Sequence, residues 1–130
     1  MTIDVEPVHV PGYVNRPYEQ VCAVLEGWKG RTVSDGSSAT FVIGEVARVS
    51  RWSAHVPIER VDAGAPPCEA ELRVLPIHTG RDSLTELLLV MSEPASQTRA
   101  CRVARTRRLL DVVVHELDAA GPSVSARVAS

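Results

Sequence analysis

Apolar residues recur at helical spacing along the last third of the chain. One stripe carries Val103, Leu110, Val113, Val114 and Leu117. No Gly or Pro occurs from residue 97 to residue 120, and a stripe repeated every three or four residues is typical of a helix that buries one face. Gly121–Pro122 then supplies a stop signal. The pattern predicts a helix over 97–120, about 35 Å long from the rise per residue, and a flexible tail over 121–130.

A second, shorter helical pattern lies near the N-terminus. Pro17 suits the first turn of a helix, and Glu19 favours the positive end of the helix dipole. Apolar residues follow at spacings of three and four: Tyr18, Val21, Cys22, Leu25 and Trp28. These positions predict a short amphipathic helix over 16–27 that ends at Gly27.

The remaining segments are predicted to be mainly strands. Ile3, Val5, Val8 and Val10 predict a first strand, and Pro7 within it is typical of the edge of a sheet. This first strand is expected to end at Pro11–Gly12. Residues 29–38 are rich in turn-forming types, so we expect a loop there. Further strands are predicted from alternation or from β-branched and aromatic residues at 40–43, 45–61, 69–78 and 83–91.

Polar residues share faces of these predicted strands with apolar ones. Arg48, Ser50 and Trp52 fall on one face of 45–61, together with Val46, Ala54, Val56 and Ile58. Glu86 shares a face of 83–91 with Leu84, Leu88 and Val90. Such faces either line a cavity, where a few polar groups orient a ligand, or meet solvent. Both readings stay open from the sequence.

The order of these elements resembles the helix-grip fold of the START-like superfamily, which includes the polyketide cyclase and dehydrase-like proteins. Val8-His9-Val10, followed by Arg16-Pro17-Tyr18-Glu19-Gln20-Val21 and Leu25, is similar to the family's opening strand and its proline-led first helix. The second similarity is the terminal helix from Arg102 to Leu117. The resemblance implies an α+β fold in which a curved antiparallel sheet carries a short N-terminal helix and a long C-terminal helix packed across it. We expect one such domain over 1–120.

The resemblance also implies a cavity between the sheet and the long helix, usually for an apolar or amphipathic ligand. We therefore predict a protein that binds a small molecule of this kind. The residues predicted to contact it are Arg48, Ser50, Trp52, Leu72, Glu86, Leu88, Leu110 and Val114. The chain departs from the family because it is short and poor in aromatic residues, so a small or collapsed pocket is an alternative.

Two other functions are compatible with the sequence. The first is an interaction module or homodimer, because strand 83–91 carries Leu on both faces and because an Arg-rich run occupies 99–108. The alternative interpretation of the Arg-rich run is a solvated helix face whose long side chains cover neighbouring apolar surface. The second is a cyclase-like enzyme in which Arg48 or Glu86 orients the substrate or transfers a proton. No G-x-S-x-G motif, phosphate loop or locally paired Cys supports catalysis, so no catalytic residue is predicted.

Composition and charge narrow the choice of partners. The chain has 130 residues, enough for one domain with its own core. Its formal net charge of -2 provides no general attraction to nucleic acid or to an anionic membrane. We expect no leader sequence, because the N-terminus lacks a basic segment followed by an apolar run. We also expect no membrane-spanning segment, because the longest apolar stretch of the second half, Leu87–Met91, is too short.

The cysteines and histidines do not indicate a metal or a cofactor. Cys22, Cys68 and Cys101 are odd in number and form no C-x-x-C pair, which predicts reduced thiols in a cytoplasmic protein. The histidines are His9, His55, His78 and His115, and their spacing does not match a zinc site. We therefore expect neither a bound metal nor a cofactor.

Overall fold

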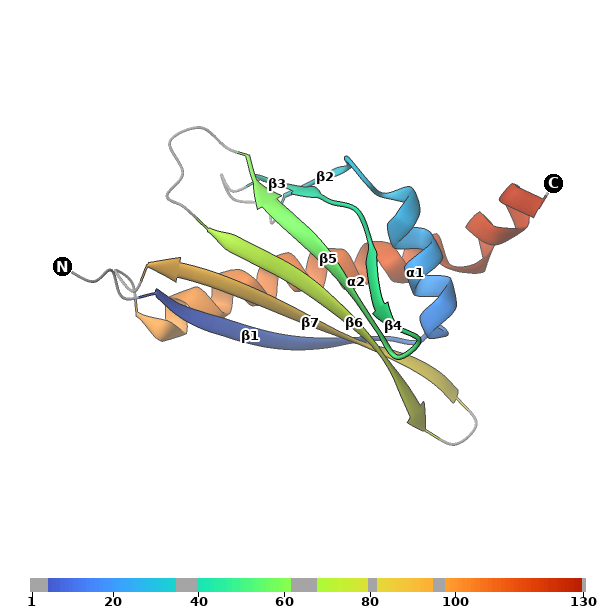
Figure 1. The fold of residues 1–130 in the computed structure, drawn as a ribbon, viewed down its shortest axis with the longest axis horizontal. Coiled ribbons are helices and arrows are strands. Elements are labelled where there is room, and N and C mark those ends of the chain that lie inside the picture. The colour runs from blue at the N-terminus through green and yellow to red at the C-terminus, as the bar shows by residue number, and fades with distance from the viewer. Residues whose placement is uncertain (1–4, 35–39, 62–67, 80–81, 95–97, 130) are drawn as a thin grey trace.

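The computed structural model describes residues 5–34, 40–61, 68–79, 82–94 and 98–129. Within these residues the chain forms two helices and seven strands, all paired antiparallel (Figure 1). The elements are β1 (Val5–Val14), α1 (Tyr18–Gly27), β2 (Thr32–Ser34), β3 (Thr40–Ile43), β4 (Ala47–Ser50), β5 (Ser53–Arg60), β6 (Glu69–Thr79), β7 (Asp82–Pro94) and α2 (Arg99–Ala129).

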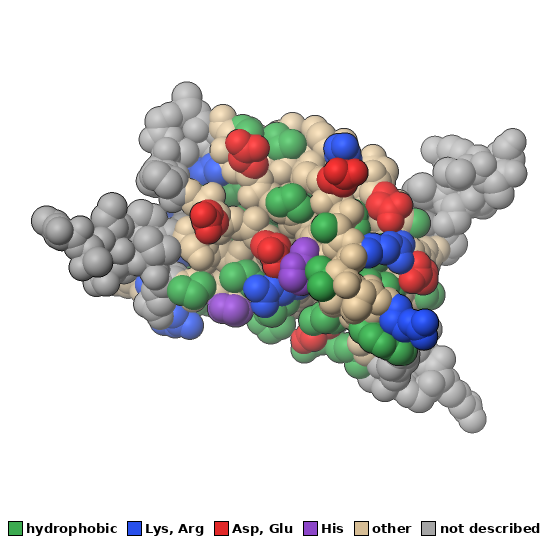
Figure 2. Space-filling model, viewed as in Figure 1, with side chains coloured by type: hydrophobic (Ala, Val, Ile, Leu, Met, Phe, Trp, Pro, Cys, Tyr) green, Lys and Arg blue, Asp and Glu red, His purple; other side chains and the backbone are tan. Residues whose placement is uncertain are grey.

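The strands form one curled sheet in the order β1-β7-β6-β5-β3-β2, with β4 also paired to β5. The first and last strands of the sequence are therefore neighbours. Helix α2 runs along one face of this sheet, and α1 lies near one end of it (Figure 1). Neither of the two described helices covers the opposite face, which is the surface turned to the viewer in Figure 2. This arrangement confirms the predicted α+β fold of the helix-grip type.

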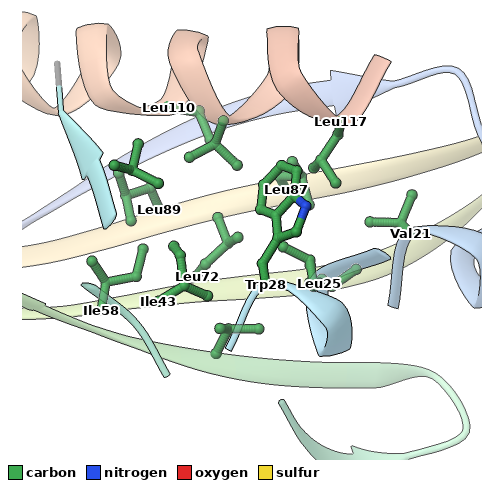
Figure 3. Packing of buried hydrophobic residues seen from close by; sticks show 14 of the residues in the cluster. Val21, Leu25, Trp28, Ile43, Ile58, Leu72, Leu87, Leu89, Leu110 and Leu117 are labelled. Atoms are coloured by element: carbon green, nitrogen blue, oxygen red, sulfur yellow. The ribbon is translucent and has the colours of Figure 1, made fainter. Parts of the chain in front are cut away.

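The space between the sheet and α2 holds the core. Alternate residues of the strands point inward and are fully buried, as the strand period requires. Leu110 and Leu117 point from α2 toward Leu72, Leu87 and Leu89 on the sheet (Figure 3). Further buried side chains from α1 and β3 complete the cluster: Val21, Cys22, Leu25, Phe41 and Ile43. The strands predicted at 69–78 and 83–91 and the alternation predicted for the first of them are thus confirmed.

Three parts of the chain differ clearly from the sequence prediction. Strand β1 continues through Pro11–Gly12 to Val14. An edge strand tolerates Pro because one side of it needs no hydrogen bond. Residues 32–34, expected in a loop, form β2 against β3. Helix α2 continues past Gly121–Pro122 to Ala129, which is compatible with Pro because a helix can bend at such a residue rather than end.

The predicted single strand over 45–61 is also wrong, since the chain turns back within it. Strands β4 and β5 form a hairpin in which Ser50 pairs with Ser53, and the register shifts around Val49. The Trp52 backbone N–H donates to Ser50 Oγ at 3.1 Å, which stabilises the turn without Gly or Pro. A serine side chain is a weak turn signal, so the sequence pattern reads as continuous.

Arginines tie the helices to the rest of the fold. Arg107 donates to the Pro11 carbonyl oxygen at 2.7 Å, and Arg102 within the same basic run is buried. The run over 99–108 is therefore partly structural rather than a uniformly solvated face. Farther along α2, Glu116 forms an ion pair of 2.6 Å with Arg31, whose guanidinium also lies 4.7 Å from the Trp28 ring centroid.

Candidate functional site

Charged side chains meet where β4 passes α1, at one end of the sheet. One guanidinium nitrogen of Arg48 donates to both carboxylate oxygens of Glu19, at 3.1 and 2.8 Å. The second terminal nitrogen donates to Glu26 at 3.2 Å. Glu19 and Glu26 are seven residues apart, so two turns of α1 place them on one side of the helix. We call this contact the Arg48 clasp, because one side chain holds β4 against both ends of α1.

Two buried polar side chains of α1 lie close to the Arg48 clasp. Tyr18 and Cys22 are one turn apart, with exposed fractions of 7% and 0%. No described residue forms a well-aligned hydrogen bond with the Tyr18 hydroxyl oxygen, although the Cys22 thiol lies near enough to interact weakly. A phenol buried in this way has unused hydrogen-bonding capacity, which costs free energy unless a further group supplies a partner.

Burial dominates the protonation behaviour of Tyr18 and Cys22, whereas hydrogen bonds dominate that of Arg48. Burial, followed by the neighbouring Cys22, raises the pKa of Tyr18 to about 12. Burial also raises the pKa of the Cys22 thiol, which keeps it a thiol and a poor nucleophile. Hydrogen bonds to Glu19 and then Glu26 raise the pKa of Arg48. Around neutral pH the site therefore presents a phenol, a thiol and a guanidinium, all of which are hydrogen-bond donors.

A surface hollow of about 470 Å³ adjoins the Arg48 clasp. Its lining residues are Glu26, Lys29, Glu45, Val46 and Arg48. Val46 packs against the hydrophobic core, so the hollow has one apolar side and a charged rim. The rim charges are mutually compensated, because Lys29 lies 3.8 Å from Glu45 while Arg48 pairs with Glu26. This volume lies within the usual range for small-molecule sites.

The residues predicted to contact a ligand are not gathered in one place. Leu72 and Leu110 are fully buried in the core, and Val114 is partly buried beside them. Glu86 and Leu88 lie on the opposite, outer face of the sheet, as the alternation with buried Leu87 shows. Contact of these residues with a ligand remains a prediction.

The other three predicted residues belong to the β4–β5 hairpin. Ser50 and Trp52 lie at its turn and are exposed, while Arg48 reaches α1. The residues that α1 contributes to this site were not predicted from the sequence, namely Tyr18, Glu19, Cys22 and Glu26. The spacing of seven between the two glutamates was the available signal. The residue that joins them could not be identified from that spacing.

Other features within the described residues carry less chemistry. A second hollow, of about 340 Å³, lies on the outer face of the sheet beside Glu71, Arg73 and Val90. In the described part of the chain no three His, Cys, Asp or Glu side chains come together as a metal site would require. Among the described helices none has the length and apolar character needed to span a membrane.

Comparison with solved structures supports the fold assignment. DynU16, from the dynemicin biosynthetic locus, matches with a TM-score of 0.51 and 20% identity over 90% of this chain and 49% of its own. Ms6760 from Mycobacterium smegmatis matches with a TM-score of 0.53 and 10% identity over 89% and 94% of the two chains. XoxI from Bacillus cereus matches with a TM-score of 0.53 and 8% identity over 92% and 97%.

These similarities establish the class of fold and nothing narrower. This chain spans about half the length of DynU16. No family model and no curated protein matches the sequence. The chain therefore has a helix-grip-like α+β fold that is shared with bacterial proteins of very different sequence.

Proposed function

We propose that the protein binds a small amphipathic molecule at the end of the sheet where β4 meets α1. The observation that carries the proposal is the buried Tyr18 hydroxyl, which lacks a well-aligned partner in the described residues while the Arg48 guanidinium lies nearby. A ligand oxygen placed between them would accept hydrogen bonds from both. The ligand is therefore a molecule with a carbonyl, carboxylate or other oxygen acceptor at one end.

The apolar part of the ligand would contact the core beside the hollow. Val46 lines the hollow and packs against the core. Leu25 of α1 and Ile43 of β3 are buried in that core. Burial of apolar surface supplies most of the affinity at such sites, while the few polar groups set the orientation. The fully buried Leu72 and Leu110 already fill the middle of the core. This occupancy favours the α1 end of the sheet over a site deep beneath α2.

Membership of the START-like superfamily is part of this proposal. The element order, the curled sheet and the two helices support it, as does the fold shared with DynU16. We also propose a reducing, cytoplasmic setting, because the three cysteines are odd in number and form no C-x-x-C pair. Catalysis has less support. Of the two residues considered for it, Arg48 lies against α1 and Glu86 on the outer face of the sheet, so they do not act on one substrate.

Titration with 1-anilinonaphthalene-8-sulfonate, an anionic amphipathic fluorophore, tests the proposed site. The Trp52→Phe background leaves Trp28, close to α1, as the single tryptophan, so energy transfer from Trp28 reports binding near the site. We expect Arg48→Ala to weaken binding by about tenfold or more, and Tyr18→Phe by several-fold, as is typical for lost charged and neutral hydrogen bonds.

Arg51→Ala is the matched control, because Arg51 is an exposed arginine in the same hairpin and lies outside the Arg48 clasp. It should leave the affinity unchanged. Native mass spectrometry of the purified protein should also detect a bound small molecule that is lost in Arg48→Ala. Equal fluorophore affinity in all of these proteins, or the absence of energy transfer from Trp28, would reject the site.

A further inference from the structure

The chain places two of its few aromatic residues on the surface. It has only two Trp, two Tyr and one Phe. Tyr18, Trp28 and Phe41 are buried, whereas Tyr13 is 51% exposed and Trp52 is 56% exposed. Aromatic side chains are enriched at the centres of protein interfaces, where they supply a large contact area at a low cost in side-chain entropy.

Tyr13 belongs to an apolar patch on the outer face of the sheet. Register pairs Tyr13 with Glu86 on β7, and Glu86 with Leu75 on β6. Apolar residues of the same three strands continue the surface on either side. We call this the outer patch: Tyr13, Leu75, Ile77, Leu84, Leu88 and Val90. Figure 2 shows apolar side chains spread over the lower half of this face, which no described helix covers.

Glu86 stands within the outer patch without a partner among the described residues. Its cross-strand neighbours are Tyr13 and Leu75, and its neighbours along the same face of β7 are Leu84 and Leu88. Glu86 is partly buried, and no described residue forms an ion pair or hydrogen bond with its side chain. A carboxylate surrounded by apolar side chains is stabilised when a cation approaches it.

A suitable cation lies on the same face, one diagonal step away. Arg73 pairs with Leu88 in the register, so Arg73 and Glu86 are diagonal neighbours, roughly 7–8 Å apart at their Cα atoms. Arg73 uses its Nε atom to donate to Glu71 at 2.8 Å. A guanidinium has two further nitrogen atoms with which to bind a second carboxylate.

We propose that the outer patch is the interface of a homodimer, in which Arg73 of each copy pairs with Glu86 of the other. If the two-fold axis lies in the interface, over the midpoint between these residues, Arg73 of each copy faces Glu86 of the other. Two equal ion pairs result. Tyr13 and the leucines would then pack around them. Because this surface contains both members of the pair, it is complementary to itself, which is the requirement for an isologous interface.

The dimensions of the outer patch predict a modest affinity. Three adjacent strands over about six residues span roughly 15 by 20 Å, so two copies would together bury roughly 600 Å², which is the size of a weak, transient contact rather than of a stable interface. We therefore expect the dissociation constant of the dimer to lie in the micromolar range. This interface lies on the opposite side of the sheet from α2 and is independent of the ligand site proposed at the Arg48 clasp.

Charge reversal combined with sedimentation velocity tests the proposal. The wild-type protein should show a concentration-dependent dimer across the micromolar range. Arg73→Glu and Glu86→Arg should each weaken the dimer by about tenfold or more, because like charges would then face each other. Mixing the two single variants should restore dimers, since each charge then meets its opposite. The double variant Arg73→Glu/Glu86→Arg should also dimerise.

Glu59→Arg is the matched control, because Glu59 is exposed on the same face, at the other end of β5 from the hairpin turn. It should dimerise like the wild type. Circular dichroism of every variant separates loss of the dimer from loss of the fold. A wild-type protein that is monomeric throughout the range overturns the proposal. A dimer unaffected by either single reversal, or single variants that fold but do not pair when mixed, does so as well.

Discussion

Leu110 of α2 lies directly against Gly12 of β1. A Cβ atom at residue 12 would come within 2.9 Å of Leu110 Cδ2, 3.2 Å of Leu110 Cγ and 3.3 Å of Val114 Cγ2. The absence of a side chain therefore lets the long helix approach the edge strand closely. Gly12 is a packing residue within β1 and not the turn residue that the Pro-Gly pair suggested.

Substitution of Gly12 measures this contact. We expect Gly12→Ala to lower the free energy of unfolding by about 1 kcal/mol and Gly12→Val by more, because overpacking a tight contact outweighs the gain from a less flexible unfolded chain. Gly27→Ala is the control. Gly27 ends α1, and a Cβ atom added to it would meet no other atom within 4 Å, so this change should stabilise the protein by about 0.5 kcal/mol.

A double-mutant cycle with Leu110→Ala checks the origin of the effect. Leu110→Ala alone should cost about 2–5 kcal/mol as a fully buried leucine. In combination with Gly12→Ala the total should be smaller than the sum, because the smaller residue 110 makes room for the new methyl group. Strict additivity would show that the two residues do not restrict each other.

Tyr18→Phe should stabilise the protein while it impairs ligand binding. Removing a buried hydroxyl that lacks a well-aligned partner among the described residues relieves a desolvation cost, so we expect the free energy of unfolding at neutral pH to rise by about 1 kcal/mol. Chemical denaturation measures this change. Tyr13→Phe, at an exposed position, should leave stability nearly unchanged. A loss of stability in Tyr18→Phe would mean that the hydroxyl has a strong partner.

The same residue predicts a loss of stability in alkaline solution. The pKa of Tyr18 is raised by burial from its ordinary value of 10.0 to about 12, so between these values the folded protein holds a proton that the unfolded chain has released. The free energy of unfolding should therefore fall as the pH rises from about 10 to about 12. This part of the decline should be missing from Tyr18→Phe and kept in Tyr13→Phe.

Thr85→Val should destabilise the protein, because it removes a hydrogen bond between β7 and the segment that precedes α1. Thr85 is fully buried, and its hydroxyl donates to the Arg16 carbonyl oxygen at 2.6 Å. Valine leaves that oxygen without its donor, at a cost of about 2 kcal/mol. Thr85→Ser keeps the bond and loses one methyl group, so it should cost about 1 kcal/mol. A larger loss for serine than for valine would show that packing, not the hydrogen bond, dominates.

Arg48→Ala should loosen β4 with little effect on global stability. The three side chains of the Arg48 clasp are 40%, 69% and 53% exposed, and exposed ion pairs contribute about 1 kcal/mol or less. Strand β4 is otherwise exposed, and among the described strands it pairs with β5 alone. We expect faster amide hydrogen exchange at residues 47–50 in Arg48→Ala, and in the wild type at high salt. Unchanged exchange there would show that the Arg48 clasp does not hold the strand.

The residues of the proposed ligand site are harder to predict from the sequence than those of the proposed interface. In the sequence, the two glutamates of α1 are only two charges seven residues apart. The pattern of the predicted strand 45–61 gives Arg48 the wrong neighbours, because it does not reveal the β4–β5 turn. That turn depends on a Ser50 side-chain hydrogen bond and on a shift of register at Val49. Neither feature changes the apolar and polar pattern. Glu86, by contrast, is correctly predicted among Leu84, Leu88 and Val90, because a strand alternates with a fixed period of two.

Local periodicity in the chain was enough to predict the two helices, the positions of the main strands and the buried face of β6, because it decides which residues can be buried together. Which distant residues meet became visible only in the folded molecule. The turn of β4 toward α1 brings Tyr18 and Arg48 near each other, and Gly12 meets Leu110 because β1 pairs with β7 beneath α2. Such contacts depend on how whole elements pack, and no local pattern records them.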